Sequence, residues 1–336
     1  MNVIDPIRLE NGRTATAVAH PNIALVKYWG KRDAELNLPA VDSLSITLDT
    51  LTTTTSVMLT DGPDVLKLND RSGSKSEQHK LRSLADAFRE ASATQFGVAV
   101  TSDNNFPTAA GLASSASGFA ALVVALDEAF ATRLSMERLS VLARRGSGSA
   151  PRSLFEGFAH MHRGQAADGS DAVASPVLAV NDWPLEVVVA ITSEEAKSIS
   201  STDGMERTRT TSPFYPTWLE SQQGDIERAL AAVAARDFDA LAAVSEHSCL
   251  KMHGLMLSAR PGLVYWNDAT TRCVHAVQSL RSSGLPVFFT IDAGPQIKAV
   301  CLPQATEAVA EALARTEGVH RVLKTGLGLG ARAAFV

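Results

Sequence analysis

The chain has 336 residues, of which 45% are hydrophobic and 20% are charged, and its formal net charge is −5. This length suits one large domain or two that share a cleft, and the composition is typical of a globular protein with a sizeable core. The negative net charge offers no general attraction to nucleic acid or acidic membranes, so any anion-binding site must be local.

The cysteine pattern and the absence of membrane signals narrow the class further. Cys249, Cys273 and Cys301 are isolated and odd in number, which argues against a disulfide framework or a zinc cage and favours a reducing compartment. No apolar run approaches the roughly 18 residues of a membrane span, and "MNVIDPIRLENG" does not resemble a signal peptide. Basic residues are not interleaved with aromatic ones at scale, so no nucleic-acid partner is expected. We therefore expect a cytoplasmic protein.

Apolar periodicity predicts the elements of the first half. We expect strands at 14–20, 44–50 and 52–60, a helix at 76–95, a strand at 98–104, helices from Leu112 through Phe130 and at 135–145 with Ser135 as N-cap, and a strand at 158–161. The polar, Gly/Ser-containing stretch 61–78 is expected to be a mobile lid loop. Its Lys75 and Lys80 are able to reach a nucleotide, although solvated surface lysines are the more common case.

The second half begins with a strand of buried type. We expect strands at 184–193, a Pro-rich connection at 210–218, two helices over 226–257 that break near Arg236–Asp237, a helix at 263–284 closed by Gly284, a strand–turn–strand at 286–302 and a helix at 303–316. Strands and helices mix without steady βαβ alternation, which favours an α+β fold. A seam near 180–195 predicts two domains, 1–185 and 186–336.

The stretch "NFPTAAGLASSASGFAAL" (105–122) places small residues at the start of an apolar helix. A helix N-terminus presents about four unpaired N–H groups and roughly half a positive charge. Gly111 and its alanine neighbours would let a phosphate approach these amides, and Ser114 and Ser115 add hydroxyls for phosphate or Mg²⁺. Tight packing of the helix against a sheet is the alternative. The stretch does not match the Walker A pattern.

Two other segments carry cations beside apolar anchors. "AHPNIALVKYWGKRD" (19–33) contains Lys27 and Lys31, and its alternative reading is an amphipathic surface helix. "RRGSGSAPRSLFEG" (144–157) joins Ser147-Gly148-Ser149 to Arg152, whose guanidinium is able to grip a carboxylate or phosphate with two parallel hydrogen bonds. Gly-Ser stretches are otherwise usually flexible loops.

"TIDAGP" places Asp292 at the end of an apolar strand, directly before a Gly-Pro turn. Most such aspartates are ordinary turn or capping residues. A carboxylate that faces a cleft at a strand end is also able to act as a base. His253, in a predicted helix, has a core position as its more common explanation.

Five segments together resemble the mevalonate diphosphate decarboxylase family, within the GHMP kinase superfamily. They are "NIALVKYWGKRD", "NFPTAAGLASSASGFAAL", "GSGSAPRSLF", "SSTDGM" (200–205) and "TIDAGP", which follow the family's order from residue 19 to 295. The resemblance implies an N-terminal domain like ribosomal protein S5 domain 2 and a ferredoxin-like C-terminal domain, with ATP and substrate in the cleft between them. We also expect a homodimer.

The resemblance implies ATP-dependent decarboxylation of a 5-phosphorylated mevalonate, with ATP and Mg²⁺ as cofactors, in the mevalonate route to isoprenoids. The γ-phosphoryl would move to the 3-hydroxyl, after which phosphate and CO₂ leave and an alkene remains. Asp292 would be the catalytic carboxylate, Lys27 would hold it ionised, and Arg152 would clamp the substrate carboxylate.

The resemblance also implies binding residues. The substrate's phosphate end would contact Tyr28, Lys31, Asp42, Ser147, Gly148 and Ser149, beside Arg152. The ATP phosphates would contact Asn104, Pro107, Thr108, Ala109, Ala110, Gly111, Leu112, Ala113, Ser114, Ser115, Lys197 and Ser200, with Ser114 or Ser115 near Mg²⁺.

Three departures bear on the number of substrate phosphates. His20 precedes Pro21, Val41-Asp42-Ser43 replaces the usual Asn-Ser-Ser, and Glu156 replaces a glycine. The first two resemble phosphomevalonate decarboxylases, whose substrate carries one phosphate fewer. If Asp42 faced the terminal phosphate, like charges about 4 Å apart would cost roughly 4 kcal/mol. This favours mevalonate 5-phosphate slightly over the 5-diphosphate, although Lys31 and Arg152 suit the more anionic ligand.

Two rival functions remain open at this point. A GHMP small-molecule kinase would transfer phosphate without releasing CO₂, and Arg152, as a carboxylate clamp, argues for decarboxylation instead. A non-catalytic ATP-binding module is the second rival, and retention of Lys27, Arg152 and Asp292 argues against it.

Overall fold

The computed structural model describes residues 9–106, 114–195 and 197–334. Its first half contains β1 (Thr14–Ala19), β2 (Asn22–Val26), β3 (Lys31–Asp33), β4 (Leu38–Pro39), β5 (Ser43–Thr47), β6 (Thr53–Thr60), β7 (Val65–Leu68), β8 (Arg71–Ser72), α1 (Lys75–Ser92), β9 (Gly97–Asn104), α2 (Ser114–Ala129), α3 (Met136–Gly146), the 3₁₀ turn η1 (Ala150–Leu154), β10 (Phe158–Met161) and β11 (Ala174–Leu178). Its second half contains β12 (Glu186–Ile191), α4 (Ser201–Thr211), α5 (Tyr215–Ala235), α6 (Phe238–Leu257), α7 (Asp268–Ser282), β13 (Val287–Ile291), β14 (Ile297–Cys301), the 3₁₀ turn η2 (Pro303–Ala305), α8 (Thr306–Ala314), β15 (Arg321–Gly326) and β16 (Arg332–Ala334).

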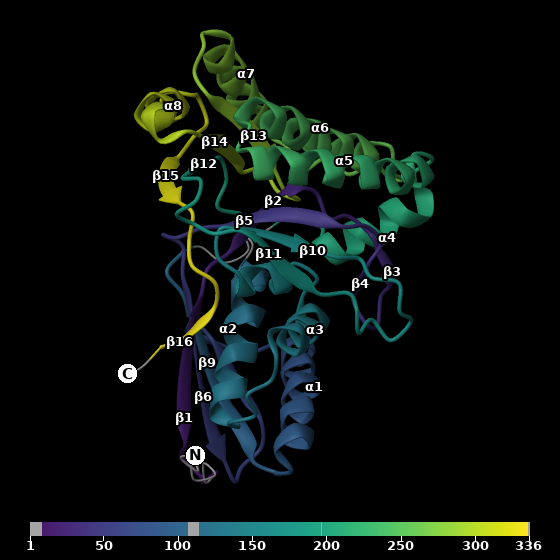
Figure 1. The fold of residues 1–336 in the computed structure, drawn as a ribbon, viewed down its shortest axis with the longest axis vertical. Coiled ribbons are helices and arrows are strands. Elements are labelled where there is room, and N and C mark those ends of the chain that lie inside the picture. Colours follow the sequence, from purple (N-terminus) through teal and green to yellow (C-terminus); the bar gives the residue numbers. More distant parts are fainter. Residues whose placement is uncertain (1–8, 107–113, 196, 335–336) are drawn as a thin grey trace.

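Among the described residues, three larger sheets are stacked along the molecule, and β3 and β4 form a separate two-stranded sheet (Figure 1). The six-stranded sheet, in the order β16-β1-β6-β9-β7-β8, lies at one end with α1, α2 and α3 beside it. The four-stranded sheet β11-β10-β5-β2 crosses the middle, and the four-stranded sheet β13-β14-β12-β15 lies at the other end with helices α5 to α8. The middle sheet is therefore the layer between the two ends of the molecule.

One apolar core joins the middle sheet to the C-terminal elements. Leu44 on β5 and Phe158 on β10 belong to the same buried cluster as Val189 on β12, Ile226 on α5 and Phe288 on β13. A separate cluster fills the N-terminal end between its sheet and helices, for example Phe88 stacked on Phe130. The middle sheet and the C-terminal half thus share one hydrophobic core, and this shared core holds the two halves of the molecule together.

The C-terminal segment returns to the N-terminal sheet, where β16 pairs with β1 in antiparallel register. The division into two domains at residue 185 stays a prediction. It would place β16 in the C-terminal domain, although β16 belongs to the N-terminal sheet. Before β16 the chain passes very close to β5, because Gly328 donates its N–H to the Thr47 carbonyl at 2.7 Å. A Cβ at Gly328 would lie 1.8 Å from the Leu48 carbonyl oxygen. Glycine is therefore required there for steric reasons.

Several predicted boundaries are confirmed with their physical cause. α5 ends at Arg236, which adopts φ +53°, and Asp237 caps α6 by accepting from the Ala240 N–H. Gly284, at φ +94°, closes α7 because its N–H and that of Leu285 donate to the Arg281 and Leu280 carbonyls. Ser135 caps α3 as expected, by accepting from the Arg138 N–H.

Other predictions were wrong. The stretch 61–78 is not an irregular loop: β7 pairs in parallel with β9 and in antiparallel with β8, and Ser74 caps α1 in a capping box with Glu77. Helix α4 and the first part of α5 were not predicted, and residues 263–267 are not helical. The alternative of a surface helix at 19–33 is also wrong, because β2 is a fully buried strand in this stretch.

The close contact at Gly328 gives a stability test. Gly328→Ala should lower the free energy of unfolding by about 1–3 kcal/mol, the usual cost of overpacking. Gly254→Ala is the matched control, because a Cβ on this α6 residue meets nothing within 4 Å, and should stabilise the protein by roughly 0.5–1 kcal/mol. Urea unfolding of both variants measures the difference, and an unchanged midpoint for Gly328→Ala would contradict the steric argument.

Candidate active site

A cavity of about 410 Å³ lies between the two halves of the molecule. Its walls come from β2 and the segment after it, the N-terminal end of α2, the segment between α3 and η1, helices α4 and α6, and the turn after β13. The described lining residues are Asn22, Ala24, Lys27, Tyr28, Trp29, Lys31, Asn37, Lys80, Ser114, Ser115, Phe119, Gly146, Ser147, Gly148, Ser149, Arg152, Lys197, Ser201, Thr202, Met205, Met252, Asp292 and Ala293.

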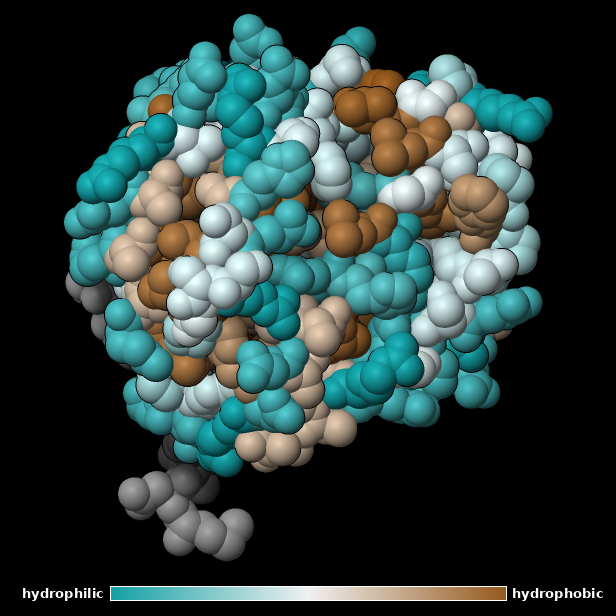
Figure 2. Space-filling model, turned by 90° about the horizontal axis from the view of Figure 1, so that it is seen from above, coloured by the Kyte–Doolittle hydropathy of each residue, from teal (hydrophilic) through white to brown (hydrophobic). Residues whose placement is uncertain are grey.

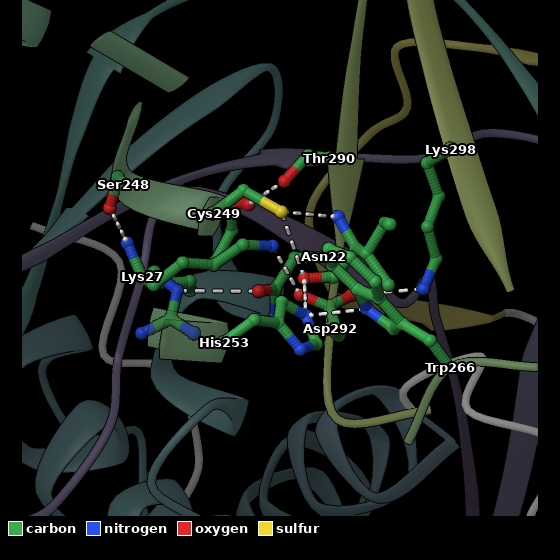
Figure 3. A network of polar contacts seen from close by, with 12 residues as sticks. Asn22, Lys27, Ser248, Cys249, His253, Trp266, Thr290, Asp292 and Lys298 are labelled. Carbon is green, nitrogen blue, oxygen red and sulfur yellow. Dashed lines mark hydrogen bonds and ion pairs between the residues drawn. The ribbon is translucent and has the colours of Figure 1, made fainter. Parts of the chain in front are cut away.

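Asp292 is held by two buried ammonium groups (Figure 3). Nζ of Lys27 lies 2.6 Å from Oδ1, and Nζ of Lys298 lies 3.1 Å from Oδ2. The lysine side chains are 1% and 2% exposed, whereas that of Asp292 is 27% exposed. The carboxylate is therefore the most accessible member of this group to a ligand in the cavity.

The electrostatics of the group keep the carboxyl ionised. Burial would raise the pKa of Asp292, but the charges of Lys27 and Lys298 outweigh burial and hold this pKa well below its usual range. Burial lowers the pKa of Lys298, and the attraction of Asp292 opposes that effect. A carboxylate with two cations on its oxygens is a weak base that stays ionised.

Lys27 is positioned through its backbone by the C-terminal helices. Its N–H donates to Ser248 Oγ on α6 at 2.9 Å, and its carbonyl accepts from Gln222 Nε2 on α5 at 3.0 Å. The register between β2 and β5 shifts between Ala24 and Val26. Such an irregularity re-aims the residues that follow it, and here Lys27 points at a residue of the other half.

Arg152 lies on η1 with a guanidinium that is fixed before any ligand binds. Nη1 donates to Ser43 Oγ on β5 at 2.7 Å, and Nε donates to Asn22 Oδ1 on β2 at 3.3 Å. Burial lowers the pKa of Arg152 to about 10, so the group is still a cation at pH 7. A fixed guanidinium on a cavity wall is suited to orienting a carboxylate.

The segment Ser147-Gly148-Ser149 forms the next part of the wall, between α3 and η1. The hydroxyls of Ser147 and Ser149 lie 3.2 Å apart, and Ser115 Oγ lies 3.4 Å from Ser147 Oγ. Tyr28 packs on Gly148, where a Cβ would lie 2.5 Å from the tyrosine Oη. That Oη is buried without a hydrogen-bond partner among the described residues, and burial raises its pKa. It is thus an available donor at the cavity.

Three further lysines make the cavity cationic. Lys197 donates to Ser201 Oγ at 2.8 Å and to the Ala293 carbonyl at 3.3 Å. Lys80 donates to the Gly146 carbonyl at 3.1 Å, so it lines the cavity and is not merely a solvated surface residue. The pKa values of Lys31, Lys80 and Lys197 are all lowered, chiefly by burial. Anionic ligands would relieve this crowding of positive charge.

The residues expected at the ATP phosphates are only partly described. Pro107, Thr108, Ala109, Ala110, Gly111, Leu112 and Ala113 lie outside the described residues. Ser114 and Ser115 begin α2 and line both the large cavity and a second one of about 170 Å³. Asn104 lines this second cavity among apolar side chains that include Leu66, Leu81 and Val100. Ser200 caps α4, next to the lining residue Ser201.

Asp42 has a different environment from its neighbours in sequence. It does not line the cavity, and its carboxylate accepts from His160 Nε2 and from the Arg163 N–H, both at 2.9 Å. Burial would raise the pKa of Asp42, but the hydrogen bonds from His160 and Arg163 lower it. The electrostatic argument for a monophosphate substrate needed Asp42 to face the ligand, and this placement removes its support.

His253 and three apolar residues complete the surroundings of Asp292. His253 is buried, packs on Trp266 with the two rings tilted and their centroids 4.6 Å apart, and has its pKa lowered to about 3 by burial. Trp29, Met205 and Met252 form an apolar wall of the cavity and belong to one buried cluster. These apolar residues and Lys298 were not predicted from the sequence as parts of a site.

Comparisons with known proteins give the family. The model of the diphosphomevalonate decarboxylase-like N-terminal domain matches residues 19–174, and that of the mevalonate 5-diphosphate decarboxylase C-terminal domain matches residues 187–325. Diphosphomevalonate decarboxylase mvd1 of Aspergillus fumigatus is 37% identical over 317 residues, which cover 88% of this chain and 78% of that protein.

Solved structures agree. Mevalonate diphosphate decarboxylase from Staphylococcus aureus matches with a TM-score of 0.90 and 34% identity over 96% of this chain and 98% of the other. A complex of MDDEF with MVAPP, AMPPCP and magnesium matches with a TM-score of 0.87 and 36% identity over 96% and 99% of the two chains. The chain belongs to the diphosphomevalonate decarboxylase family and is an ATP-dependent carboxy-lyase, and the expected two-domain α+β fold of the GHMP kinase type is confirmed.

The pairing of Asp292 with two lysines gives a titration test. Lys298→Met should raise the pKa of Asp292 by about 1–3, because one of its two neighbouring cations is lost. The measurement is the ¹³C chemical shift of the Asp292 carboxyl as a function of pH, assigned by comparison with Asp292→Asn. In the wild type this carboxyl should stay ionised over the pH range in which the protein is folded. In Lys298→Met it should become protonated at a higher pH than in the wild type. Lys324→Met removes an exposed lysine of the same sheet and should leave this titration unchanged.

Stability should follow the same titration. Because the folded pKa of Asp292 lies below its unfolded value, its contribution is fully present above about pH 5 and declines as the pH falls below about 4, by up to about 1.4 kcal/mol per pH unit. Lys298→Met should weaken this contribution, so the stability gap to wild type should narrow in acid. Equal titration of Asp292 in both proteins would contradict the proposed pairing.

Proposed function

We propose that this chain decarboxylates mevalonate 5-diphosphate in an ATP-dependent reaction that passes through phosphorylation of the 3-hydroxyl. One observation carries the proposal: a carboxylate held between two buried ammonium groups faces a cavity that also contains a preformed guanidinium. Hydroxide is a poor leaving group, so transfer of the γ-phosphoryl to the tertiary alcohol makes departure possible. Loss of phosphate then gives C3 cationic character, and the C–C bond to the carboxylate supplies the electrons as CO₂ leaves.

Asp292 would accept a hydrogen bond from the substrate's 3-hydroxyl. Its low pKa makes orientation of this hydroxyl its main role before phosphoryl transfer, because Lys27 and Lys298 oppose protonation. The negative charge of bound phosphates beside Lys27 would weaken that opposition and bring the carboxylate closer to a general base. When phosphate departs, the same negative charge would stabilise the developing cation at C3.

Arg152 would hold the substrate carboxylate. Its bonds to Ser43 and Asn22 fix the plane of the guanidinium, so a bidentate carboxylate would be aligned with the breaking C–O bond. The apolar wall of Trp29, Met205 and Met252 would cover the substrate's methyl side and exclude water from the reacting carbon.

The substrate's phosphate end would meet Lys31, Tyr28 and the hydroxyls of Ser147 and Ser149. The unpartnered Tyr28 Oη supports this role, because buried hydroxyls are rarely left without a hydrogen bond. The Tyr28 ring fills the space left by the missing side chain of Gly148, so these two predicted residues are in direct contact.

ATP would occupy the two neighbouring cavities, with its base among the apolar residues beside Asn104 and its phosphates at Ser114, Ser115 and Lys197. Mg²⁺ would neutralise part of the charge of the phosphates. The hydroxyls of Ser114 and Ser115 fit such an ion, because Mg²⁺ takes oxygen ligands and keeps few of them from the protein.

The diphosphate is preferred over the monophosphate for three reasons. The family relatives are named for the diphosphate, and Asp42 bonds His160 and Arg163 instead of facing the cavity. Lys31 and Lys80, both with a pKa lowered chiefly by burial, suit a richly charged ligand.

The homodimer and the cytoplasmic location stay predictions. Figure 2 looks down on the C-terminal helices and shows apolar side chains among polar ones on that face. Leu250 and Leu257 of α6, seven residues apart, are exposed at 44% and 54% and would suit a contact between copies of the chain. Within the described residues, no helix is long and apolar enough to cross a membrane.

The role of Asp292 is tested by Asp292→Asn. This variant keeps the side-chain size but loses the charge, so binding of ATP and substrate should stay within severalfold while turnover falls by about 10²–10⁴-fold. Isothermal titration measures binding, and release of phosphate and CO₂ measures turnover. Near-normal turnover would remove Asp292 from the reaction.

The substrate is tested by steady-state turnover with mevalonate 5-phosphate and mevalonate 5-diphosphate side by side, following CO₂ and phosphate. The kcat/KM should be at least tenfold higher for the diphosphate. A higher value for the monophosphate would instead make the chain a phosphomevalonate decarboxylase. Phosphorylation without CO₂ would identify a kinase, and ATP binding without substrate-dependent consumption would identify a non-catalytic module.

A further inference from the structure

A second polar cluster lies outside the cavity, on the middle sheet. His160 is on β10, His162 follows that strand with its N–H bonded to the Val173 carbonyl, and Asp42 directly precedes β5. Because His160 pairs with Leu44 in antiparallel register, continuing the register by two residues brings position 42 opposite position 162. Residues two apart on a strand point to the same face, so all three side chains lie together.

We propose that Asp42, His160 and His162 bind a divalent transition-metal ion, with Zn²⁺ as the ion that this donor set fits best. One ligand atom from each residue lies within 4.8 Å of the others. Zinc takes imidazole nitrogen and carboxylate oxygen at about 2.0–2.2 Å, which places neighbouring donors roughly 3.3 Å apart. His160 Nε2 and Asp42 Oδ2 are 2.9 Å apart, and the two imidazole centroids are 4.0 Å apart. Small side-chain rotations therefore suffice.

The outer hydrogen bonds of a metal site are already in place. The Arg163 N–H donates to Asp42 Oδ1 at 2.9 Å. The other oxygen, Oδ2, faces His160 and would be the atom that binds the metal ion. His162 Nε2 lies 2.9 Å from Ser175 Oγ on β11, which fixes the orientation of that ring. Partners of this kind orient ligands and are a usual part of protein metal sites. Three protein ligands would leave a fourth position for water.

Such an ion would join β5, whose Ser43 contacts Arg152, to the neighbouring strand β10. Asp42 is adjacent to Ser43, whose hydroxyl accepts from Arg152 Nη1 at 2.7 Å. The ion would link the start of β5 to the end of β10. Its three ligands do not line the cavity, but Asp42 is next in sequence to Ser43, which contacts the lining residue Arg152. Its role would be to fix the position of this wall.

The test is zinc binding to chelator-treated, untagged protein without nucleotide, which excludes metal held by ATP phosphates. Isothermal titration with ZnCl₂ should give one ion per chain, and Zn²⁺ should raise the melting temperature. His162→Ala and Asp42→Asn should each weaken binding at least about 10–100-fold, the loss that even an outer-shell change causes. His275→Ala, an exposed histidine on α7, is the matched control and should bind like wild type.

Co²⁺ distinguishes this site from the cysteines. The Co²⁺-loaded protein should show visible d–d bands without thiolate charge-transfer absorption, and His162→Ala should lose these bands. Circular dichroism confirms that each variant is folded. Absence of zinc binding by the wild type, binding unchanged in both site variants, or thiolate bands would each overturn the proposal. None of these measurements uses turnover, so they are independent of the proposed function.

Discussion

The pairing of Asp292 with Lys27 and Lys298 is the contact on which the site depends. Lys27 comes from the N-terminal half, whereas Asp292 and Lys298 come from one hairpin of the C-terminal sheet. Two ammonium groups that are almost fully buried would be costly without a counter-charge, and the carboxylate supplies it. The contact holds only if the halves are rigidly placed, and the shared core beneath the middle sheet provides that placement. The ion pairs of Asp292 therefore depend on the packing of the two halves.

Hydrogen bonds to the backbone help to position the elements of the site. Lys27 is held at its N–H and carbonyl by α6 and α5, and the Gly328 segment bonds the ends of β5 and η1. β16 then pairs with β1 at the far end of the N-terminal sheet. Both halves of the molecule therefore line the cavity.

Much of the site could be predicted from the sequence because its motifs are local. Arg152, the Ser147–Ser149 segment and Asp292 stand in short stretches whose residue types suggest their chemistry, and the structure brings them to one cavity. Lys298 could not be found in this way, because its approach to Asp292 depends on the register of the β13–β14 hairpin, in which Thr290 pairs with Lys298. The argument from Asp42 depended on its facing the ligand, and its carboxylate bonds His160 and Arg163 instead, because neighbouring residues of an extended chain point to opposite faces and Asp42 does not follow Ser43 toward Arg152. β2 lacked an alternating pattern because it is buried on both faces.

The charge of the cavity opposes that of the whole protein. The chain carries a net charge of −5, yet the described lining residues hold five cationic side chains, Lys27, Lys31, Lys80, Lys197 and Arg152, against the single carboxylate of Asp292. Burial is the chief cause of the lowered pKa values of Lys31, Lys80 and Lys197, and the charge of Lys80 adds to the lowering at Lys31. Polyanionic ligands would balance this excess of positive charge in the cavity. Arg152 and Asp292 are fixed beforehand by their own partners, so under the proposed function more of the binding energy would remain to bring phosphate, carboxylate and hydroxyl groups into reacting positions.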